Sequence, residues 1–210
     1  MSCPTFLSLC PHSTSHDYAM TSVAEIFKSM EYGPAPEGDQ QARQWLGKFE
    51  KVFGHFINGE WTEPATTFDV TNPSTGEVLA TLPNMDVPEA KLATARAAEA
   101  QVAWAAKTGK ERAAVLKKLH ALMMENADDL ATIMTAEQGK PFLEAKGEIA
   151  YGAGYVEWFG EEAKRVYGDT IRGHQPDKRI IVIKQPVGVV ATITPWNFPN
   201  AMLARKMAPA

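Results

Sequence analysis

The alternation of apolar and polar residues predicts strands in the second quarter of the chain. Residues 56–61 place an Asn58-Gly59 pair between apolar residues, which is the strongest short-range signal of a β-hairpin. A second hairpin is predicted to follow, with extended pieces over 68–70 and 78–82 on either side of a turn rich in Asn, Pro and Gly.

The apolar residues then recur at helical spacing over four stretches. Two of these stretches open with a capping-box pattern, an oxygen-bearing N-cap residue followed by Glu three positions later. A glycine and a proline separate the last two stretches. The predicted starts and stops are Asp86 with Glu89, Thr108 with Glu111, Asp128 or Asp129, Gly139, and a final helix from about Pro141 to Tyr167.

Beyond Gly168 the pattern changes back to strands. Residues 179–184 are rich in β-branched side chains, and residues 187–194 form a near-continuous apolar run typical of a strand buried on both faces of a parallel sheet. Pro199 suits the first turn of a new helix that continues to residue 210. We predict an α/β fold. Since one parallel strand cannot bury its own faces, we expect the chain to be incomplete.

The first 52 residues are predicted to be additions to the main domain, which covers residues 53–210. Residues 1–20 read as a disordered tail, without the apolar core of a signal peptide or the Arg content of a transit peptide. Residues 21–52 read as a helical leader that packs its few apolar residues, including Trp45, Leu46 and Phe49, on the main domain.

Composition excludes several classes of protein. The 210 residues are 45% hydrophobic and 22% charged, and the formal net charge of −4 argues against nucleic-acid binding. No uncharged apolar run is long enough to span a membrane. The two cysteines, Cys3 and Cys10, lack the spacing of a metal site. His12 and His16 are four residues apart, but they lie in a polar stretch without the helix that this spacing would need to form a metal site.

A glycine pair could be mistaken for a dinucleotide-binding loop. Gly152 and Gly154 have the first spacing of that motif, but helical pattern lies on both sides and Glu157 occupies the third glycine position. We interpret the pair as glycine faces that allow close helix packing. Lys140, Arg165 and Lys178 are interpreted as ordinary surface charges.

Ligands of α/β folds usually bind where a parallel strand ends and a helix begins. Residues 194–199 occupy that place. From local pattern alone, Asn197 is best explained as the cap of the helix that Pro199 opens.

A family resemblance changes that interpretation. Residues 193–199 resemble the signature segment of the NAD(P)-dependent aldehyde dehydrogenase superfamily, and residues 56–61, 137–141 and 184–189 follow in that family's order. The resemblance covers about residues 53–210. Residues 157–159, 167–171 and 177–179 are most similar to succinate-semialdehyde dehydrogenases, whereas the leader is similar to that of a separate, longer aldehyde dehydrogenase class.

The resemblance implies a role for each residue of this segment. Asn197 would donate its side-chain amide to the oxyanion formed when a cysteine thiolate attacks the aldehyde. Arg205 would bind the substrate carboxylate or the cofactor, although it could equally be a solvated charge beside Lys206. The stretch implied to lie along NAD or NADP is Ile193, Thr194, Pro195 and Trp196.

Three hypotheses follow from the sequence. In the first, the chain is the N-terminal portion of a cytoplasmic dehydrogenase that takes succinate semialdehyde, or a similar carboxylated aldehyde, to its acid with NAD or NADP and is a homo-oligomer when complete. It has no cysteine or glutamate at the family's nucleophile and base positions, so alone it would be inactive. Alternatively, it is a short, inactive paralogue whose arm strands near residues 170–185 pair with a full-length dehydrogenase. The third alternative is a fragment that folds poorly and aggregates.

Overall fold

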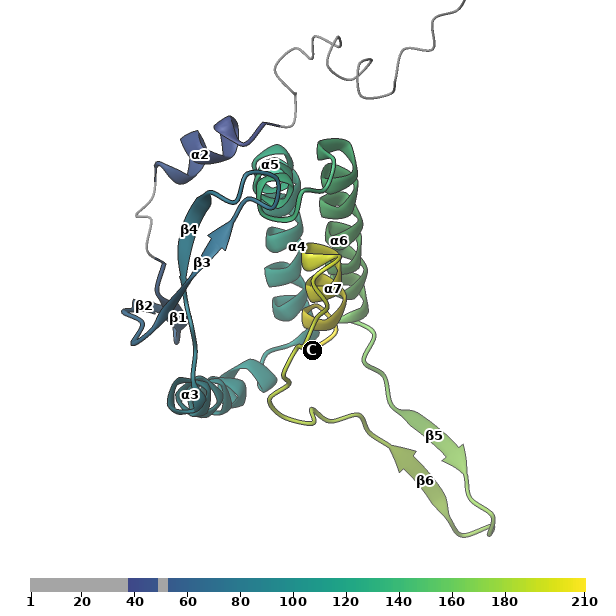
Figure 1. Ribbon diagram of the computed structural model, residues 1–210. Coiled ribbons are helices and arrows are strands. Elements are labelled where there is room, and N and C mark those ends of the chain that lie inside the picture. The colour runs from purple at the N-terminus through teal and green to yellow at the C-terminus, as the bar shows by residue number, and fades with distance from the viewer. Residues whose placement is uncertain (1–37, 49–52) are drawn as a thin grey trace, which may run out of the picture. The chain divides into compact units, whose positions relative to one another are not determined.

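The computed structural model describes residues 38–48 and 53–210, all within the compact unit Pro36–Ala210. The predicted tail, the helix expected near Ile26, and Phe49 lie outside the described residues. The described strands pair as three antiparallel hairpins, and a group of packed helices lies between the second and third (Figure 1). The described elements are α2 (Gln40–Leu46), β1 (His55–Ile57), β2 (Glu60–Thr62), β3 (Thr67–Thr71), β4 (Val78–Pro83), α3 (Val87–Ala105), α4 (Gly109–Glu125), α5 (Ala127–Gln138), α6 (Phe142–Glu162), β5 (Asp169–Arg172), β6 (Arg179–Val182) and α7 (Pro199–Met207).

Both hairpins predicted in the second quarter are confirmed. Asn58 and Gly59 take positive φ angles of 57° and 83°, as the two central residues of a type I′ turn must. The turn places Phe56 opposite Trp61, with ring centroids 5.0 Å apart. In the second hairpin, the Asn72 side-chain oxygen accepts a hydrogen bond from the Ser74 N–H at 2.9 Å and closes the turn locally.

The helix α2 packs on the second hairpin and on α5. Ala42 is fully buried against Leu79 of β4 and Ala136 of α5, and Leu46 lies beside this cluster. Arg43 extends the contact with an ion pair to Glu77 at 2.6 Å. Leu46, one of the apolar residues of the leader expected to contact the main domain, therefore lies against it.

The helix α6 lies at the centre of the helical layer. It packs against α4, α5 and α7, and its most buried large side chains are Ile149 and Val156. Ile149 belongs to a cluster with α5, and Val156 belongs to a second cluster that includes Ala204 of α7. The first cluster holds α5 to α6, and the second holds α7 to α6 and so places the segment before α7.

The helix ends follow the predicted positions in part. α5 begins at Ala127, one residue before the predicted Asp128, α7 ends at Met207 instead of residue 210, and two further differences concern α3 and α6. Thr108 and Glu111 form the expected reciprocal capping box, and Gly139 ends α5 with φ 76°. Asp86 caps α3 by accepting from the Val87 N–H, but within the described residues Glu89 does not complete the second box. The helix α6 ends at Glu162, five residues before the predicted Tyr167, because its last turn tightens to bonds between residues three apart.

The predicted packing role of the glycine pair holds for one glycine only. A Cβ on Gly152 would lie 2.2 Å from the Asn200 side-chain oxygen and 3.4 Å from the Ala201 Cα atom, so Gly152 allows α7 to approach α6 closely. Gly154 has open space around its Cα atom.

The third hairpin confirms strands on either side of residue 175. The strands β5 and β6 pair antiparallel, are exposed along their whole length and project away from the helices (Figure 1). The prediction of a buried strand over residues 187–194 was wrong for this structure. No described strand runs beside this segment to supply ladder hydrogen bonds, and Val187 and Ile193 are 94% and 85% exposed.

Two glycine substitutions are expected to change stability in opposite directions. A Cβ on Gly109 would lie 2.4 Å from the Ala163 backbone oxygen, so Gly109→Ala should lower the free energy of unfolding by about 1–3 kcal/mol. Gly154→Ala makes the same change inside α6 without a clash and should raise that free energy by up to about 1 kcal/mol. Urea unfolding measures both. Shifts of the same sign would contradict this account of the α4–α6 contact.

A charge cluster between α4 and α6 predicts a pH dependence. Ion pairs with Lys117 at 2.7 Å and Lys164 at 2.6 Å lower the pKa of Glu161 from 4.5 to about 2. Because the pKa is lowered on folding, the stabilisation is fully present above pH 4.5 and is lost as the pH falls to about 2. We expect an NMR titration to give a pKa of about 2 for Glu161.

Two matched variants show whether the Lys117–Glu161 ion pair, and not the general positive charge of α4, lowers the pKa of Glu161. Lys117→Met should move the pKa of Glu161 back toward 4.5. Lys118→Met removes a neighbouring charge of α4 that forms no ion pair among the described residues. This variant should leave the pKa of Glu161 nearly unchanged. Equal effects of the two variants would show that the Lys117 contact does not cause the shift.

Candidate functional site

The segment that the sequence singles out, residues 193–199, leads directly into α7. Pro199 occupies the first turn of α7, as predicted, and Phe198 is the residue at the N-cap position. Asn197 therefore does not cap the helix, and the local interpretation of this residue was wrong. Its side chain is exposed, and within the described residues its amide makes no hydrogen bond.

A buried glutamate from α6 takes the place of the expected cap. One carboxylate oxygen of Glu148 accepts hydrogen bonds from the backbone N–H groups of Asn200 at 2.9 Å and Ala201 at 3.2 Å. These are N–H groups without partners inside the helix, and the N-terminus of a helix favours a negative charge. The Glu148 side chain is 1% exposed, so it acts as a cap supplied by a different helix.

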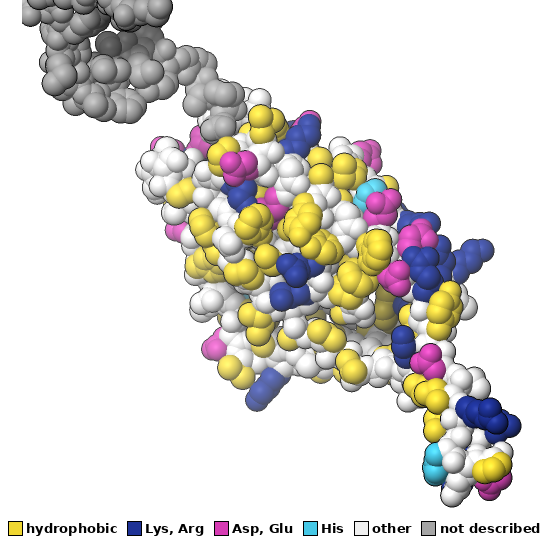
Figure 2. All heavy atoms as spheres, turned by 90° about the vertical axis from the view of Figure 1, so that its right-hand side faces the viewer, with side chains coloured by type: hydrophobic (Ala, Val, Ile, Leu, Met, Phe, Trp, Pro, Cys, Tyr) yellow, Lys and Arg dark blue, Asp and Glu magenta, His cyan; other side chains and the backbone are white. Residues whose placement is uncertain are grey.

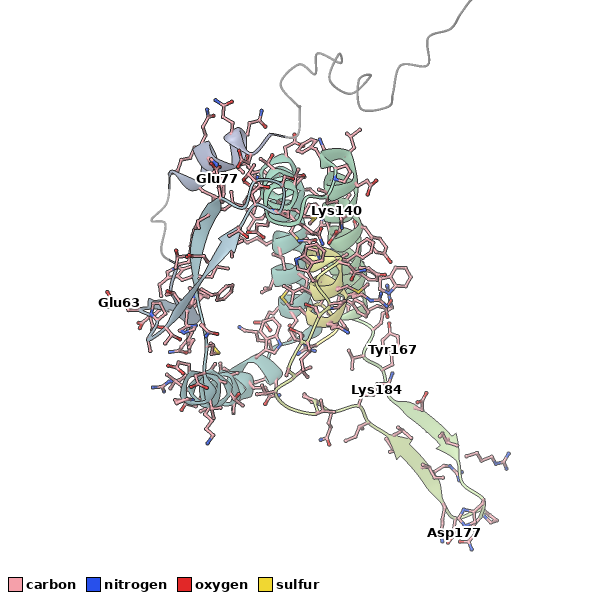
Figure 3. The ribbon with its side chains drawn as sticks, in the orientation of Figure 1. Glu63, Glu77, Lys140, Tyr167, Asp177 and Lys184 are labelled. Atoms are coloured by element: carbon pink, nitrogen blue, oxygen red, sulfur yellow. The ribbon has the colours of Figure 1, made fainter. Side chains whose placement is uncertain are left out.

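Lys140 completes this arrangement. Its ammonium pairs with the second carboxylate oxygen of Glu148 and also donates a hydrogen bond of 2.9 Å to the backbone oxygen of Asn197. It lies 4.2 Å from the centroid of the Phe198 ring, within the range of a cation–π interaction. Figure 3 shows Lys140 at the start of α6, above α7. The interpretation of Lys140 as an ordinary surface charge was wrong, because its side chain is only 13% exposed.

A second side chain from the same link holds the preceding residue. Gln138, the last residue of α5, donates from its side-chain amide to the backbone oxygen of Trp196 at 2.8 Å. Gln138 and Lys140 thus bind two successive carbonyl groups, those of Trp196 and Asn197. Sequence reasoning gave Gln138 no role of its own and interpreted Lys140 as a surface charge. A signal was present in the Gly139 helix stop, which brings the two side chains onto one short link.

The residues before Asn197 form an exposed run without paired strand neighbours. Ile193 and Trp196 are 85% and 68% exposed, Pro195 is exposed and Thr194 is half-buried. An extended, mostly apolar run with a flat indole ring fits the flat rings of a dinucleotide. These side chains could therefore hold such a molecule along residues 193–196.

Arg205 lies in the last turn of α7, beside α6. Its guanidinium is 5.6 Å from the centroid of the Tyr155 ring, and Tyr155 packs edge-on against Tyr151. The hydrogen bond between the two hydroxyls raises the pKa of Tyr155. An open, mainly apolar depression of about 600 Å³ adjoins these rings. It lies on the α6 face, where Figure 2 shows hydrophobic side chains gathered. Its lining residues are Ala150, Tyr151, Gly154, Tyr155, Trp158 and Phe159.

The site therefore combines three kinds of group, two at the start and the end of α7 and one on the neighbouring face of α6. Asn197 offers amide donors, Arg205 offers a planar cation, and an apolar depression lies beside the arginine. Amide donors suit a developing oxyanion, and a guanidinium suits a carboxylate.

Comparison with known proteins identifies the family of the chain. The sequence model of the aldehyde dehydrogenase family matches residues 61–210. The chain belongs to the aldehyde dehydrogenase family. The match includes Asn197, Arg205 and the whole segment before α7.

Two of the curated relatives are semialdehyde dehydrogenases. The chain is 61% identical over 157 residues to the glutarate-semialdehyde dehydrogenase of Pseudomonas putida. The aligned residues cover 74% of this chain and 33% of that protein. It is 58% identical over 156 residues to the NADP(+) succinate-semialdehyde dehydrogenase of Escherichia coli, covering 73% of this chain and 32% of that protein. The chain spans about a third of the length of these relatives.

A solved relative shows the same fold. The aldehyde dehydrogenase of Brucella melitensis biovar abortus 2308 is 53% identical, with a TM-score of 0.73 over 78% of this chain and 34% of that one. The described residues therefore have the N-terminal part of the aldehyde dehydrogenase fold, with its hairpins and helical layer.

Two further findings concern the described residues. No group of three or more His, Cys, Asp and Glu side chains in residues 38–48 and 53–210 is placed to hold a metal ion. In the same part of the chain, each helix is too short or too polar to cross a bilayer. Cys3, Cys10, His12 and His16 lie outside it.

Proposed function

We propose that the native protein oxidises succinate semialdehyde, or a similar aldehyde that carries a carboxylate, to the corresponding acid with NAD or NADP. The observation that carries this proposal is the placement of Asn197 just before α7 and of Arg205 in the last turn of the same short helix. From Pro199 to Arg205 the helix rises roughly 9 Å. That span allows an amide at one end and a guanidinium near the other to contact the two oxygen-bearing ends of one short substrate.

Asn197 is the proposed catalytic residue of this chain. A thiolate attacks the aldehyde carbon and its electron pair forms the new C–S bond, while the carbonyl π electrons move onto oxygen. The Asn197 amide donates a hydrogen bond to that oxyanion, which is stronger than its bond to the neutral aldehyde. When the oxyanion collapses, the aldehyde hydrogen leaves as hydride, and water then hydrolyses the thioester to acid and free thiol.

The proposed cofactor contacts lie in residues 193–196. When bound, NAD or NADP supplies the hydride acceptor. Ile193, Thr194, Pro195 and Trp196 would lie along it and keep bulk water from the reacting carbon. The NADP(+) in the name of the E. coli relative supports a nicotinamide cofactor. The chemistry of these four side chains does not distinguish NAD from NADP, which differ at the ribose 2′ position.

Arg205 is the proposed substrate-binding residue. Its fork of donors fits a carboxylate, and the apolar depression beside Tyr155 fits a methylene chain. The thiolate and the water-activating base are proposed to lie outside the described residues. We propose that the 210 residues alone do not turn over aldehydes, since the covalent route requires a thiolate and both cysteines lie in the first ten residues.

The exposed hairpin of β5 and β6 supports a proposal about partners. Both strands present apolar side chains to solvent, among them Ile171 and Ile181, which is 74% exposed. A hairpin with free strand edges can add to a sheet of a second subunit. We propose that the native protein is a homo-oligomer of the cytoplasm. The second candidate, a non-catalytic chain that joins a longer dehydrogenase, uses the same hairpin.

One purification tests both candidates. The native protein is captured from its source with an antibody to the loop between β5 and β6, its intact mass is measured, and the same sample is assayed for nicotinamide reduction. We expect activity with succinate and glutarate semialdehydes that exceeds activity with an uncharged aldehyde of equal length. Nicotinamide reduction by none of these aldehydes would contradict the proposed enzyme. A 23 kDa species held at fixed ratio to a longer dehydrogenase would favour the second candidate.

A further inference from the structure

The donor amide of Asn197 needs support from outside its own segment. Phe198 is neither helical nor in a strand, with φ −136° and ψ 71°, and Asn197 is exposed on a link between two proline residues. A hydrogen-bond donor stabilises a transition state only when its direction is fixed beforehand. The side chains that fix this backbone are therefore part of the working site.

Two hydrogen bonds fix the carbonyl groups on either side of the Asn197 Cα atom. Gln138 binds the Trp196 oxygen at 2.8 Å, and Lys140 binds the Asn197 oxygen at 2.9 Å. Two fixed peptide planes determine the direction of the Cα–Cβ bond between them. The contact of Lys140 with the Phe198 ring at 4.2 Å extends the same restraint by one residue.

Glu148 fixes Lys140 in turn. Its carboxylate binds Lys140 on one oxygen and the Asn200 and Ala201 N–H groups on the other. The same buried group therefore ties the lysine to the start of α7. The Lys140 ammonium therefore cannot turn toward solvent without leaving the buried Glu148 carboxylate unpaired.

We propose that Lys140 and Gln138, anchored by Glu148, are positioning residues that hold the Asn197 amide in the direction needed for oxyanion binding. The proposal rests on the proposed function, since it assigns these residues to the placement of its oxyanion donor. Neither residue contacts substrate. Their effect on the reaction passes through Asn197, which separates this role from general support of the fold.

The first test measures position without activity. Backbone order parameters of Asn197 and Phe198 are measured by NMR in the full 210-residue chain and in Lys140→Met. We expect both to fall in the variant, with a smaller fall in Gln138→Met, which changes no charge. Lys146→Met is the matched control, because Lys146 lies on the adjoining helix α6 but pairs with Asp128 away from this segment. Unchanged order in Lys140→Met and Gln138→Met would overturn the proposal.

The second test is a double-mutant cycle in the native protein, with each substitution introduced at the chromosomal locus. Lys140→Met should lower kcat by up to about 10²-fold with little change in KM, and Lys140→Arg should restore part of that loss. In an Asn197→Ala background, Lys140→Met should add almost nothing to the loss of kcat. Multiplied losses would overturn the proposal even if Asn197 is catalytic.

The two tests distinguish failure of the proposed function from failure of the positioning proposal. If Asn197→Ala leaves kcat unchanged while Lys140→Met loosens residues 197 and 198, the proposed role of Asn197 fails, and only the restraint of this backbone by Lys140 stands. If Lys140→Met unfolds the chain, Gln138→Met decides, because it removes one neutral donor and leaves the buried charge pair intact. Loss of kcat in Gln138→Met that disappears in the Asn197→Ala background supports the proposal, and loss that persists overturns it.

Discussion

Asn197→Ala is expected to lower the kcat of the native dehydrogenase by about 10²–10³-fold, which corresponds to about 2.7–4 kcal/mol of transition-state stabilisation. The physical reason is that the amide meets a full negative charge only in the transition state and the tetrahedral intermediate. Binding of the neutral aldehyde should weaken little, so KM should change less than kcat. Steady-state kinetics with succinate semialdehyde at saturating cofactor measure both constants.

The control for this substitution is another exposed asparagine. Asn84 follows β4 and offers the same side chain far along the chain from residues 193–199. Asn84→Ala should leave kcat within twofold of the natural protein (about the scatter expected of a neutral surface change). A rise in KM with unchanged kcat for Asn197→Ala would show that Asn197 binds substrate only in its ground state, and the proposed role would then be wrong.

Glu148→Leu is expected to destabilise the fold by about 3–5 kcal/mol, the range for removing one partner of a buried ion pair. The substitution leaves the Lys140 ammonium without its counter-charge and the N–H groups of Asn200 and Ala201 without an acceptor. Urea unfolding of the full chain, followed by circular dichroism, measures the loss. A small domain has only about 5–15 kcal/mol of stability in total, so the effect is large.

Two matched variants show which part of Glu148 matters. Glu148→Gln keeps an oxygen for the two N–H groups but loses the charge, so its loss should be intermediate. Lys146→Met removes one partner of the exposed pair with Asp128 and should change stability by about 1 kcal/mol or less. Equal losses for Glu148→Leu and Lys146→Met would contradict the buried, bonded state of Glu148.

Local elements of this fold could be predicted from the sequence because their causes are local. The Asn58-Gly59 turn needs two residues that tolerate positive φ, and the chain supplies them between two aromatic residues. The side chains of Thr108 and Glu111 each accept a hydrogen bond from the backbone N–H of the other residue, three positions away. Gly139 ends α5 because glycine readily adopts the positive φ found there. Such signals act over a few residues, so no tertiary contact is needed to read them.

Elements that depend on distant partners were predicted less well. Asp86 caps its helix, but within the described residues Glu89 makes no return bond, because the pattern allows a capping box without requiring one. Residues 187–194 have the composition of a buried strand, but a strand also requires hydrogen-bonding neighbours. The described residues supply none.

The candidate site shows the same division. The sequence by itself determined the family, through the ordered segments that end in residues 193–199, and it singled out Asn197 and Arg205. Only the tertiary structure decided that Lys140 and Glu148 meet beside Asn197. These residues are separated by eight positions from each other and by about fifty from the segment that they bind. The sequence does not show whether a charged side chain is buried, since burial depends on which helices pack around it.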